Sequence, residues 1–149
     1  MSESTITTDA LLAQLNAARG ELAERMGITL VEASPERVVA TMPVEGNRQP
    51  YGLLHGGASA VLAETAGSVA AGLAAGPGRA PVGIEINATH HRAVTKGLVT
   101  AVATPIRVGQ QLATFDIRIT DEAGRVVCTS RLTCMLRSQP PAGGRVPTP

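Results

Sequence analysis

The chain has 149 residues and a mass of 15.3 kDa, which is the size of one ordinary domain. Apolar residues make up 44% and charged residues 17% of the sequence, a composition that excludes a disordered chain. The formal net charge is +1 and Tyr51 and Phe115 are the only aromatic residues, so neither phosphate neutralisation nor base stacking favours nucleic acid as a partner.

The N-terminal segment predicts one helix over residues 7–27, because leucine, alanine and methionine recur there at spacings of three and four. Thr8 or Asp9 would cap its beginning. Two short runs rich in β-forming residues follow over 28–33 and 37–44, and turn residues separate them. We therefore expect a helix followed by two paired strands.

Residues 58–75 predict a long helix that is rich in alanine, leucine and valine and carries a single charge, Glu64. A helix that is apolar on every side is expected to be buried in a folded protein. A membrane span is the alternative, but Glu64 interrupts the apolar stretch near its middle and glycine and serine are scattered through it. We expect a buried helix and no membrane.

Four strand-like runs follow this helix: residues 82–93, 98–108, 111–120 and 126–136. The third run alternates, with Phe115, Ile117 and Ile119 on one face. Short connections favour antiparallel pairing. The order predicts an α+β fold in which one antiparallel sheet wraps around one central helix.

We expect a single domain over residues 1–137, in which residues 1–27 form an N-terminal helical segment. Residues 138–149 contain four prolines and two glycines and predict a flexible tail without chemistry.

The two cysteines, Cys128 and Cys134, lie six residues apart in one predicted strand, about 20 Å at the usual rise of a strand. A disulfide needs Cα atoms within about 7 Å, so we expect no bond between them. The sequence has no cysteine and histidine spacing typical of zinc sites, and its first ten residues lack the pattern of a signal peptide. A reducing cytoplasm and no metal are therefore expected.

A histidine and two glycines, His55, Gly56 and Gly57, stand where the long helix is expected to begin. The first N–H groups of a helix lack intrahelical acceptors, carry partial positive charge and are easily approached at a glycine. Such a helix end can stabilise a carbonyl oxygen that becomes negative. Alternatively, the glycines only form a tight entry into the helix.

Glu64 is a candidate base or nucleophile, because a carboxylate on an apolar helix is costly to bury without a partner or a use. Ser68 follows one turn later on the same face. Glu64 lies two and a half turns beyond His55, so it is remote from that end of its own helix. The alternative is an ion pair of Glu64 with Arg92 or Arg107 at a subunit interface.

His90 and His91 lie in the run that follows the long helix and would point to opposite faces of a strand. One of them is expected to face a cleft and the other solvent or a partner. Two ordinary histidines on an edge strand are the alternative.

Several motifs together carry a family resemblance: QPYGLLHGGAS at 49–59, LAE at 62–64, GS at 67–68, VGIEINATH at 82–90, DEAGR at 121–125 and SRLT at 130–133. They resemble the hotdog-fold acyl-CoA thioesterases, in particular the branch of the dihydroxynaphthoyl-CoA thioesterases and the proofreading thioesterase of enterobactin synthesis. The resemblance extends over residues 28–136. It implies a hotdog fold, homodimers that pair into homotetramers, and active sites at the subunit interface, where the helix end of one chain meets Glu64 of the other.

The resemblance also implies catalytic roles. Glu64 would be the nucleophile or general base, and the Gly56 N–H would polarise the thioester carbonyl. Gln49 would help to hold the carbonyl or acyl group, His55 would fix the loop or the thioester, and Ser68 would help to position water.

Two further segments would bind the substrate by the same resemblance. The acyl and pantetheine tunnel would be lined by Gly83, His90, His91, Arg92 and Ala93. The nucleotide end of CoA would meet the loop of Arg107, Val108, Gly109, Gln110, Gln111 and Leu112. Family members often carry Gly-Ser-Arg where this chain has Gly109-Gln110-Gln111, so Arg107 or Arg137 would have to replace the missing arginine.

We therefore expect a cytoplasmic acyl-CoA thioesterase that releases CoA and a free acid, with an aromatic acyl group preferred by resemblance. It would need no cofactor, since CoA is part of the substrate. Three alternatives stay open: a medium-chain aliphatic acyl-CoA thioesterase, an acyl-CoA sensor without turnover, and a hotdog dehydratase.

Overall fold

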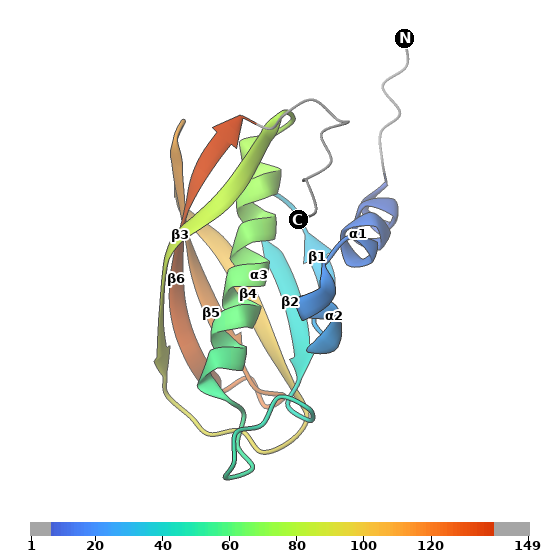
Figure 1. Ribbon diagram of the computed structural model, residues 1–149, viewed down its shortest axis with the longest axis vertical. Helices are drawn as coiled ribbons and strands as arrows, with labels where there is room; N and C mark the ends of the chain where they lie inside the picture. Colours follow the sequence, from blue (N-terminus) through green and yellow to red (C-terminus); the bar gives the residue numbers. More distant parts are fainter. Residues whose placement is uncertain (1–6, 139–149) are drawn as a thin grey trace, which may run out of the picture.

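The computed structural model describes residues 7–138 and shows one curved antiparallel sheet around one long helix (Figure 1). The helices are α1 (Thr8–Ala17), α2 (Glu21–Arg25) and α3 (Gly56–Ala75). The strands are β1 (Thr29–Ala33), β2 (Val38–Pro43), β3 (Arg79–His90), β4 (Leu98–Val108), β5 (Leu112–Thr120) and β6 (Val126–Ser138). The six strands lie in the order β1-β2-β4-β5-β6-β3. The predicted α+β architecture, a hotdog fold, is confirmed.

Helix α3 lies across the concave face of the sheet and packs on strands β2 to β6. Its contact face consists of small residues and one leucine: Ala58, Ser59, Leu62, Ala63, Ala66, Gly67, Ala70 and Ala71. Opposite this face lie Phe115, Ile117 and Ile119 of β5, all fully buried, as the alternation in the sequence predicts. Small helix residues and large strand residues therefore complement one another in the core.

The expectation that α3 is buried on every side is wrong for the single chain. Glu64 is exposed, and Thr65, Ser68 and Val69 are only partly buried, because the sheet covers one side of the helix. Helix α3 is long and apolar enough to cross a membrane by length and composition alone, but the core helix of a soluble protein passes the same test. Its packing against the sheet identifies it as a core helix.

The N-terminal segment forms two helices instead of the predicted single one. Helix α1 ends at Ala17 and α2 begins at Glu21, because Gly20 adopts a φ of +85°, which no helix continues through. The cap is Thr7, whose Oγ1 accepts from the Ala10 N–H at 3.3 Å, and neither Thr8 nor Asp9. We call α1, α2 and their connection, residues 8–25, the N-terminal arm.

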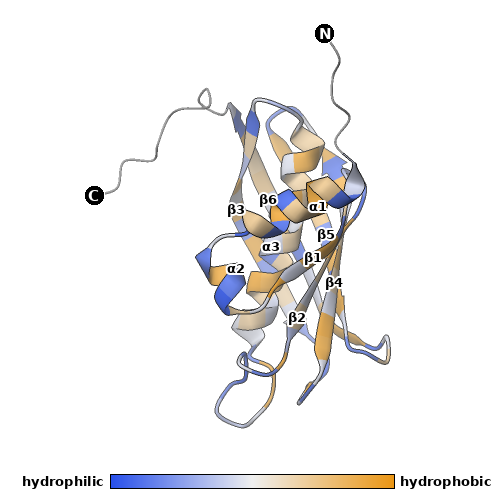
Figure 2. Cartoon of the chain, turned by 90° about the vertical axis from the view of Figure 1, so that its right-hand side faces the viewer, coloured by the Kyte–Doolittle hydropathy of each residue, from blue (hydrophilic) through white to orange (hydrophobic). Residues whose placement is uncertain are grey.

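The N-terminal arm is fixed to the sheet by the side chain of Asn16. Its Nδ2 donates to the backbone oxygens of Leu12 at 3.1 Å and Leu30 at 2.9 Å, and its Oδ1 accepts from the Leu30 N–H at 2.9 Å. One side chain thus satisfies both backbone groups of a residue in the edge strand β1. Figure 2 shows the arm in front of α3 and beside β1.

Strands β3 and β6 have boundaries that differ from the predicted ones. Strand β3 begins at Arg79, three residues earlier than predicted, and ends at His90, because it pairs with β6 along its whole length. Strand β6 extends to Ser138. The rest of the predicted tail, residues 139–149, lies outside the described residues.

Two glycines of α3 test whether close packing of the helix fixes this fold. A Cβ at Gly67 would lie 2.7 Å from Leu132 Cδ2 in the buried core, whereas a Cβ at Gly72 would have its nearest contacts at 3.6 Å. We predict that Gly67→Ala lowers the free energy of unfolding by about 1–3 kcal/mol through overpacking. Gly72→Ala should be neutral or stabilise by up to about 1 kcal/mol through helix propensity.

Urea unfolding of both variants at one protein concentration measures these changes. A Gly67→Ala variant as stable as Gly72→Ala would contradict the packing described for α3.

Candidate active site

Within residues 7–138, the beginning of α3 leaves one backbone N–H group free, that of Gly56. His55 is the N-cap, with φ −67° and ψ 131°, and its Nδ1 accepts from the Gly57 N–H at 2.8 Å. The Gly56 N–H donates to no acceptor among the described residues. This end of the helix therefore offers an oxyanion a donor together with the positive end of the helix dipole.

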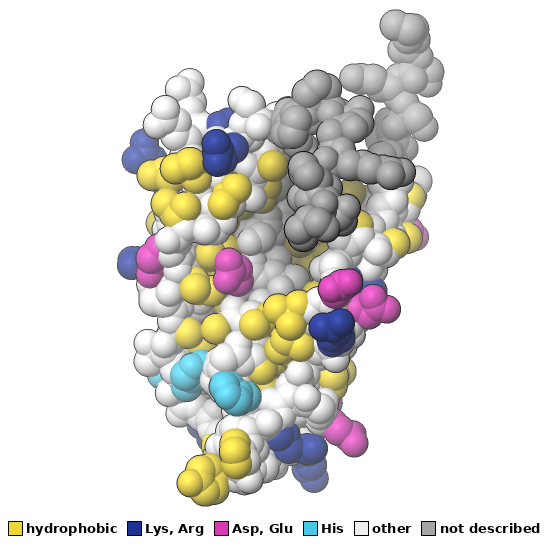
Figure 3. Space-filling view, in the orientation of Figure 1, with side chains coloured by type: hydrophobic (Ala, Val, Ile, Leu, Met, Phe, Trp, Pro, Cys, Tyr) yellow, Lys and Arg dark blue, Asp and Glu magenta, His cyan; other side chains and the backbone are white. Residues whose placement is uncertain are grey.

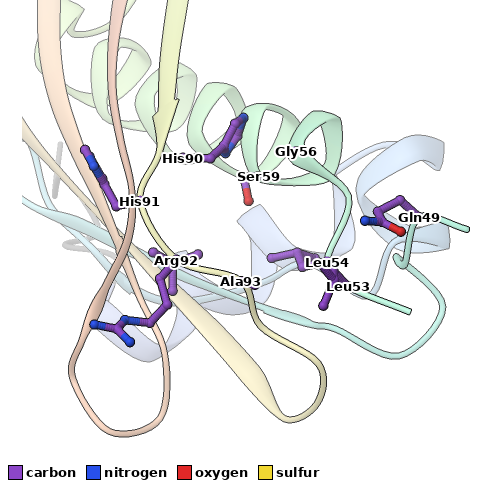
Figure 4. Close-up of a pocket in the computed structure, with 10 residues that line it drawn as sticks. Gln49, Leu53, Leu54, Gly56, Ser59, His90, His91, Arg92 and Ala93 are labelled. Atoms are coloured by element: carbon purple, nitrogen blue, oxygen red, sulfur yellow. The ribbon is translucent and has the colours of Figure 1, made fainter. Parts of the chain in front are cut away.

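His90, at the end of β3, lies directly beside this helix end. A Cβ at Gly56 would lie 2.8 Å from His90 Nε2, so only a glycine leaves room for the imidazole. Histidine side chains gather on this face where α3 begins (Figure 3). His91 turns to the other side of the strand, where its Nε2 lies 2.8 Å from Thr129 Oγ1 on β6 (Figure 4).

A hollow of about 380 Å³ adjoins the beginning of α3, and we call it the helix-end hollow (Figure 4). Its lining residues are Gln49, Leu53, Leu54, Gly56, Ser59, His90, His91, Arg92, Ala93 and Val127. The structure thus brings together six residues that the sequence singled out. Gln49 Oε1 accepts from the Tyr51 N–H of its own loop, which orients the amide. Leu53, Leu54, Ser59 and Val127 were not predicted, although the leucines directly precede the His-Gly-Gly motif.

Glu64 and Ser68 line a different hollow, of about 330 Å³, on the side of α3 that the sheet leaves open. Thr65 and Val69 of α3 contribute to it, and the opposite wall consists of Leu15, Ala18, Arg19 and Leu30. We call it the arm hollow, because residues of the N-terminal arm form most of that wall. Sequence reasoning missed the wall entirely, since nothing in the local pattern of the arm indicates a contact with α3.

Within one chain, Glu64 and Gly56 therefore do not share a site. They are eight residues apart on α3, about 12 Å along the helix axis. The ion pairs among the described residues are Glu32 with Arg37 and Asp121 with Arg125, and neither includes Glu64. The carboxylate of Glu64 is thus free to act on a molecule that reaches the surface of α3.

Two neighbours confine the Glu64 carboxylate. A Cβ at Gly83 of β3 would lie 2.7 Å from Glu64 Oε1, so the missing side chain leaves the space that the carboxylate occupies. Cys134, which faces Gly83 across the β3–β6 pair, is buried beneath Glu64 and Ser68. Burial raises the pKa of the Cys134 thiol, a hydrogen bond with Ser68 opposes this shift, and the charge of Glu64 adds to it.

The predicted CoA loop forms a third hollow, of about 710 Å³, between β4 and β5. Arg107, Gly109, Gln110, Gln111, Leu112 and Thr114 line it, whereas Val108 is exposed without lining it. Arg79 Nη2 donates to the Gln110 backbone oxygen, so this loop lies beside the beginning of β3. His90, at the helix-end hollow, stands at the opposite end of that strand.

Over residues 7–138, no cluster of three or more histidine, cysteine, aspartate or glutamate side chains is arranged to hold a metal ion.

Comparisons with known proteins converge on one family. The model of the family described as Thioesterase superfamily matches residues 51–128. The proofreading thioesterase EntH of Cronobacter turicensis is 50% identical over 115 residues, which cover 76% of this chain and 84% of that protein.

Solved structures agree. A thioesterase from Haemophilus influenzae matches with a TM-score of 0.81 and 38% identity, covering 91% of this chain and 94% of its own. A mutant form of a thioesterase from Pseudomonas aeruginosa matches with a TM-score of 0.82 and 40% identity, covering 86% and 94%.

Burial keeps the two thiols near the site protonated. Burial raises the pKa of Cys128 and of Cys134 above the ordinary value of 9.0. The unfolded chain ionises its thiols at lower pH than the folded chain. The free energy of unfolding therefore falls as the pH rises through about 9. We predict that the native protein reacts slowly with a thiol reagent at pH 8, whereas the urea-unfolded protein reacts at both cysteines. We also predict that the free energy of unfolding of the Cys128→Ala, Cys134→Ala double variant falls less between pH 8 and pH 10 than that of the wild type.

Rapid labelling of the folded protein, or an unchanged pH dependence in the double variant, would contradict the burial of these thiols.

Proposed function

Because the chain belongs to the thioesterase superfamily and is a thioester hydrolase, we propose that it hydrolyses an acyl-CoA to a free acid and CoA at a site shared by two copies of the chain. The observation that carries this proposal is the separation of Gly56 and Glu64 along one helix, each facing its own hollow. An oxyanion donor and a carboxylate can act on one carbonyl only if they meet.

The open edge of the sheet offers a way for them to meet. Strand β3 is an edge strand, and Val82 and Ile84 on it are exposed. An edge strand presents unpaired N–H and C=O groups, with which a strand of another chain can pair. Two copies of β3 related by a twofold axis would pair in antiparallel orientation and continue the sheet from one subunit into the next.

Such pairing supports a composite site. Gly83 lies against Glu64, and His90, seven residues further along the same strand, lies against Gly56. In an antiparallel pair whose twofold axis passes between Ile86 and Asn87, Gly83 of one strand lies opposite His90 of the other. Glu64 of one subunit would then face the partner's Gly56.

The proposed chemistry uses groups that this geometry makes available. The thioester carbonyl oxygen accepts from the Gly56 N–H, which stabilises the negative charge that develops on it. Glu64 either attacks the carbonyl carbon, releasing CoA thiolate and leaving a mixed anhydride that water hydrolyses, or takes a proton from the water that attacks. Ser68 would help to position that water, Gln49 would help to hold the acyl group, and His55 fixes the loop through its bond to Gly57.

The arm hollow supports an aromatic acyl group as substrate. It is about 330 Å³ in volume and includes apolar side chains from Leu15, Ala18, Leu30 and Val69. A cavity of about 150 Å³ already accepts benzene. The CoA portion would extend past the segment of His91, Arg92 and Ala93, and its nucleotide end would meet the hollow that contains Arg107 and Gln110.

We further propose that the enzyme acts in the cytoplasm as a homotetramer of two such dimers. No metal or cofactor is required by this mechanism, because the carboxylate and the helix end supply the base or nucleophile and the oxyanion donor.

Removal of the carboxylate tests this function. We predict that Glu64→Ala lowers the rate of free-thiol release from benzoyl-CoA by about 10²-fold or more, because the base or nucleophile is lost. Glu36→Ala, which removes an exposed carboxylate from the turn between β1 and β2, is the matched control and should leave the rate unchanged. A chelator should also leave turnover intact.

Decanoyl-CoA assayed in parallel compares the aliphatic with the aromatic acyl class. Near wild-type turnover by Glu64→Ala would remove this mechanism.

A further inference from the structure

The guanidinium of Arg19 is held in an unusual position in the connection between α1 and α2. Its Nη1 donates to the Asn16 backbone oxygen at 2.7 Å, and the side chain of Asn16 is bonded to Leu30 of β1. Gly20, with its φ of +85°, turns the chain directly after Arg19. The arginine is therefore positioned by the same contacts that fix the N-terminal arm to the sheet.

Arg19 also lacks a partner for its charge. Its Nε is the one buried side-chain nitrogen or oxygen without a hydrogen-bond partner among residues 7–138. In the same part of the chain, no carboxylate lies within ion-pair distance of it. A buried donor without an acceptor destabilises a protein, and a charged one does so more strongly. Because the protein itself encloses Nε, and Nη1 is bonded to Asn16, an incoming molecule would meet the Nη2 end of the guanidinium.

Arg19 borders a hollow beside Glu21 and Glu24 as well as the arm hollow, and of these two only the arm hollow contains Glu64. Arg19 belongs to the arm wall, and Glu64 and Ser68 belong to the α3 wall of the same hollow. A thioester whose carbonyl carbon lies at Glu64 would place the far end of its acyl group toward the arm. Between the two charged groups the lining is largely apolar, with Leu15, Ala18 and Val69.

We propose that Arg19 selects acyl groups that carry a second carboxylate at the end remote from the thioester. This inference rests on the proposed function, because it takes Glu64 as the group that acts on the thioester. With Nη1 bonded to Asn16 and Nε enclosed, Nη2 remains to donate a charge-assisted hydrogen bond to a carboxylate. A neutral acyl group offers the positive charge of Arg19, which has no ion pair among residues 7–138, no counterpart.

Two matched substrate pairs test this selection. Benzoyl-CoA is compared with 4-carboxybenzoyl-CoA, and hexanoyl-CoA with adipoyl-CoA, by kcat/KM for thiol release. The wild type should prefer the carboxylated member of at least one pair. Arg19→Met should lower that preference by about tenfold or more, because a hydrogen bond to a charged group usually contributes that much to binding. The same variant should change kcat/KM for the neutral member by less than about threefold.

Arg19→Lys, which keeps the positive charge but replaces the guanidinium with an ammonium group, should retain part of the preference. Arg25→Met removes an exposed arginine of α2 and should behave as the wild type.

A binding measurement separates this inference from the proposed function. In the Glu64→Ala background, calorimetry compares the Kd of 4-carboxybenzoyl-CoA and benzoyl-CoA with Arg19 present and with Arg19→Met. Weaker binding of the carboxylated ligand alone supports the selection. A wild type that hydrolyses neutral members better, or an Arg19→Met variant that weakens both members equally, overturns it. Failure to release thiol from any substrate would refute the proposed function, and the binding result would still decide the role of Arg19.

Discussion

The packing of α3 on one side only is the constraint on which the rest of the structure depends. Its small residues let the helix approach the sheet so closely that a single added Cβ at Gly67 would overlap Leu132. Because one sheet covers one face, the opposite face and the beginning of the helix remain open. If α3 were covered on every side, the Glu64 carboxylate would be buried and could not reach a substrate.

The same packing separates the two halves of the chemistry. The beginning of α3 offers the Gly56 N–H beside His90, and the open face carries Glu64 beside Gly83. Both positions are bordered by the edge strand β3, Glu64 at Gly83 and the helix beginning at His90, where the strand ends. A second copy of the chain on that edge can therefore reunite the two groups without any change in the fold of either subunit.

The N-terminal arm gives the open face of α3 a specific shape. Asn16 replaces a missing strand partner of Leu30, and this places Leu15, Ala18 and Arg19 opposite Glu64. Asn47 acts similarly at the other end of the arm, since its Nδ2 donates to the backbone oxygens of Met26 and Pro43 at 2.8 Å each. Two side-chain amides thus convert a short helical segment into one wall of a substrate-sized hollow.

Local patterns predicted those parts of the molecule that local forces determine. The alternation around Phe115 predicted the buried face of β5, and the apolar run predicted α3 to within two residues of its start. The break at Gly20 was not predictable, because leucine and alanine keep their helical spacing across it and a single glycine is tolerated in a helix. The exposure of Glu64, the early start of β3 and the wall formed by Arg19 depend on contacts between distant segments, which no local spacing encodes.

The sharing of one site by two subunits is tested most directly by mixing two inactive variants. Glu64→Ala removes the carboxylate, and Gly56→Val blocks the other half-site, since a Cβ there would lie 2.8 Å from His90 Nε2. The two chains, each with its own tag, are refolded together, and dimers that carry both tags are isolated and assayed for thiol release. Such a dimer holds one intact site and one site that carries both substitutions. About half of the wild-type rate per dimer should therefore return, although each variant alone is inactive. Mixed dimers that form but remain inactive would contradict a shared site.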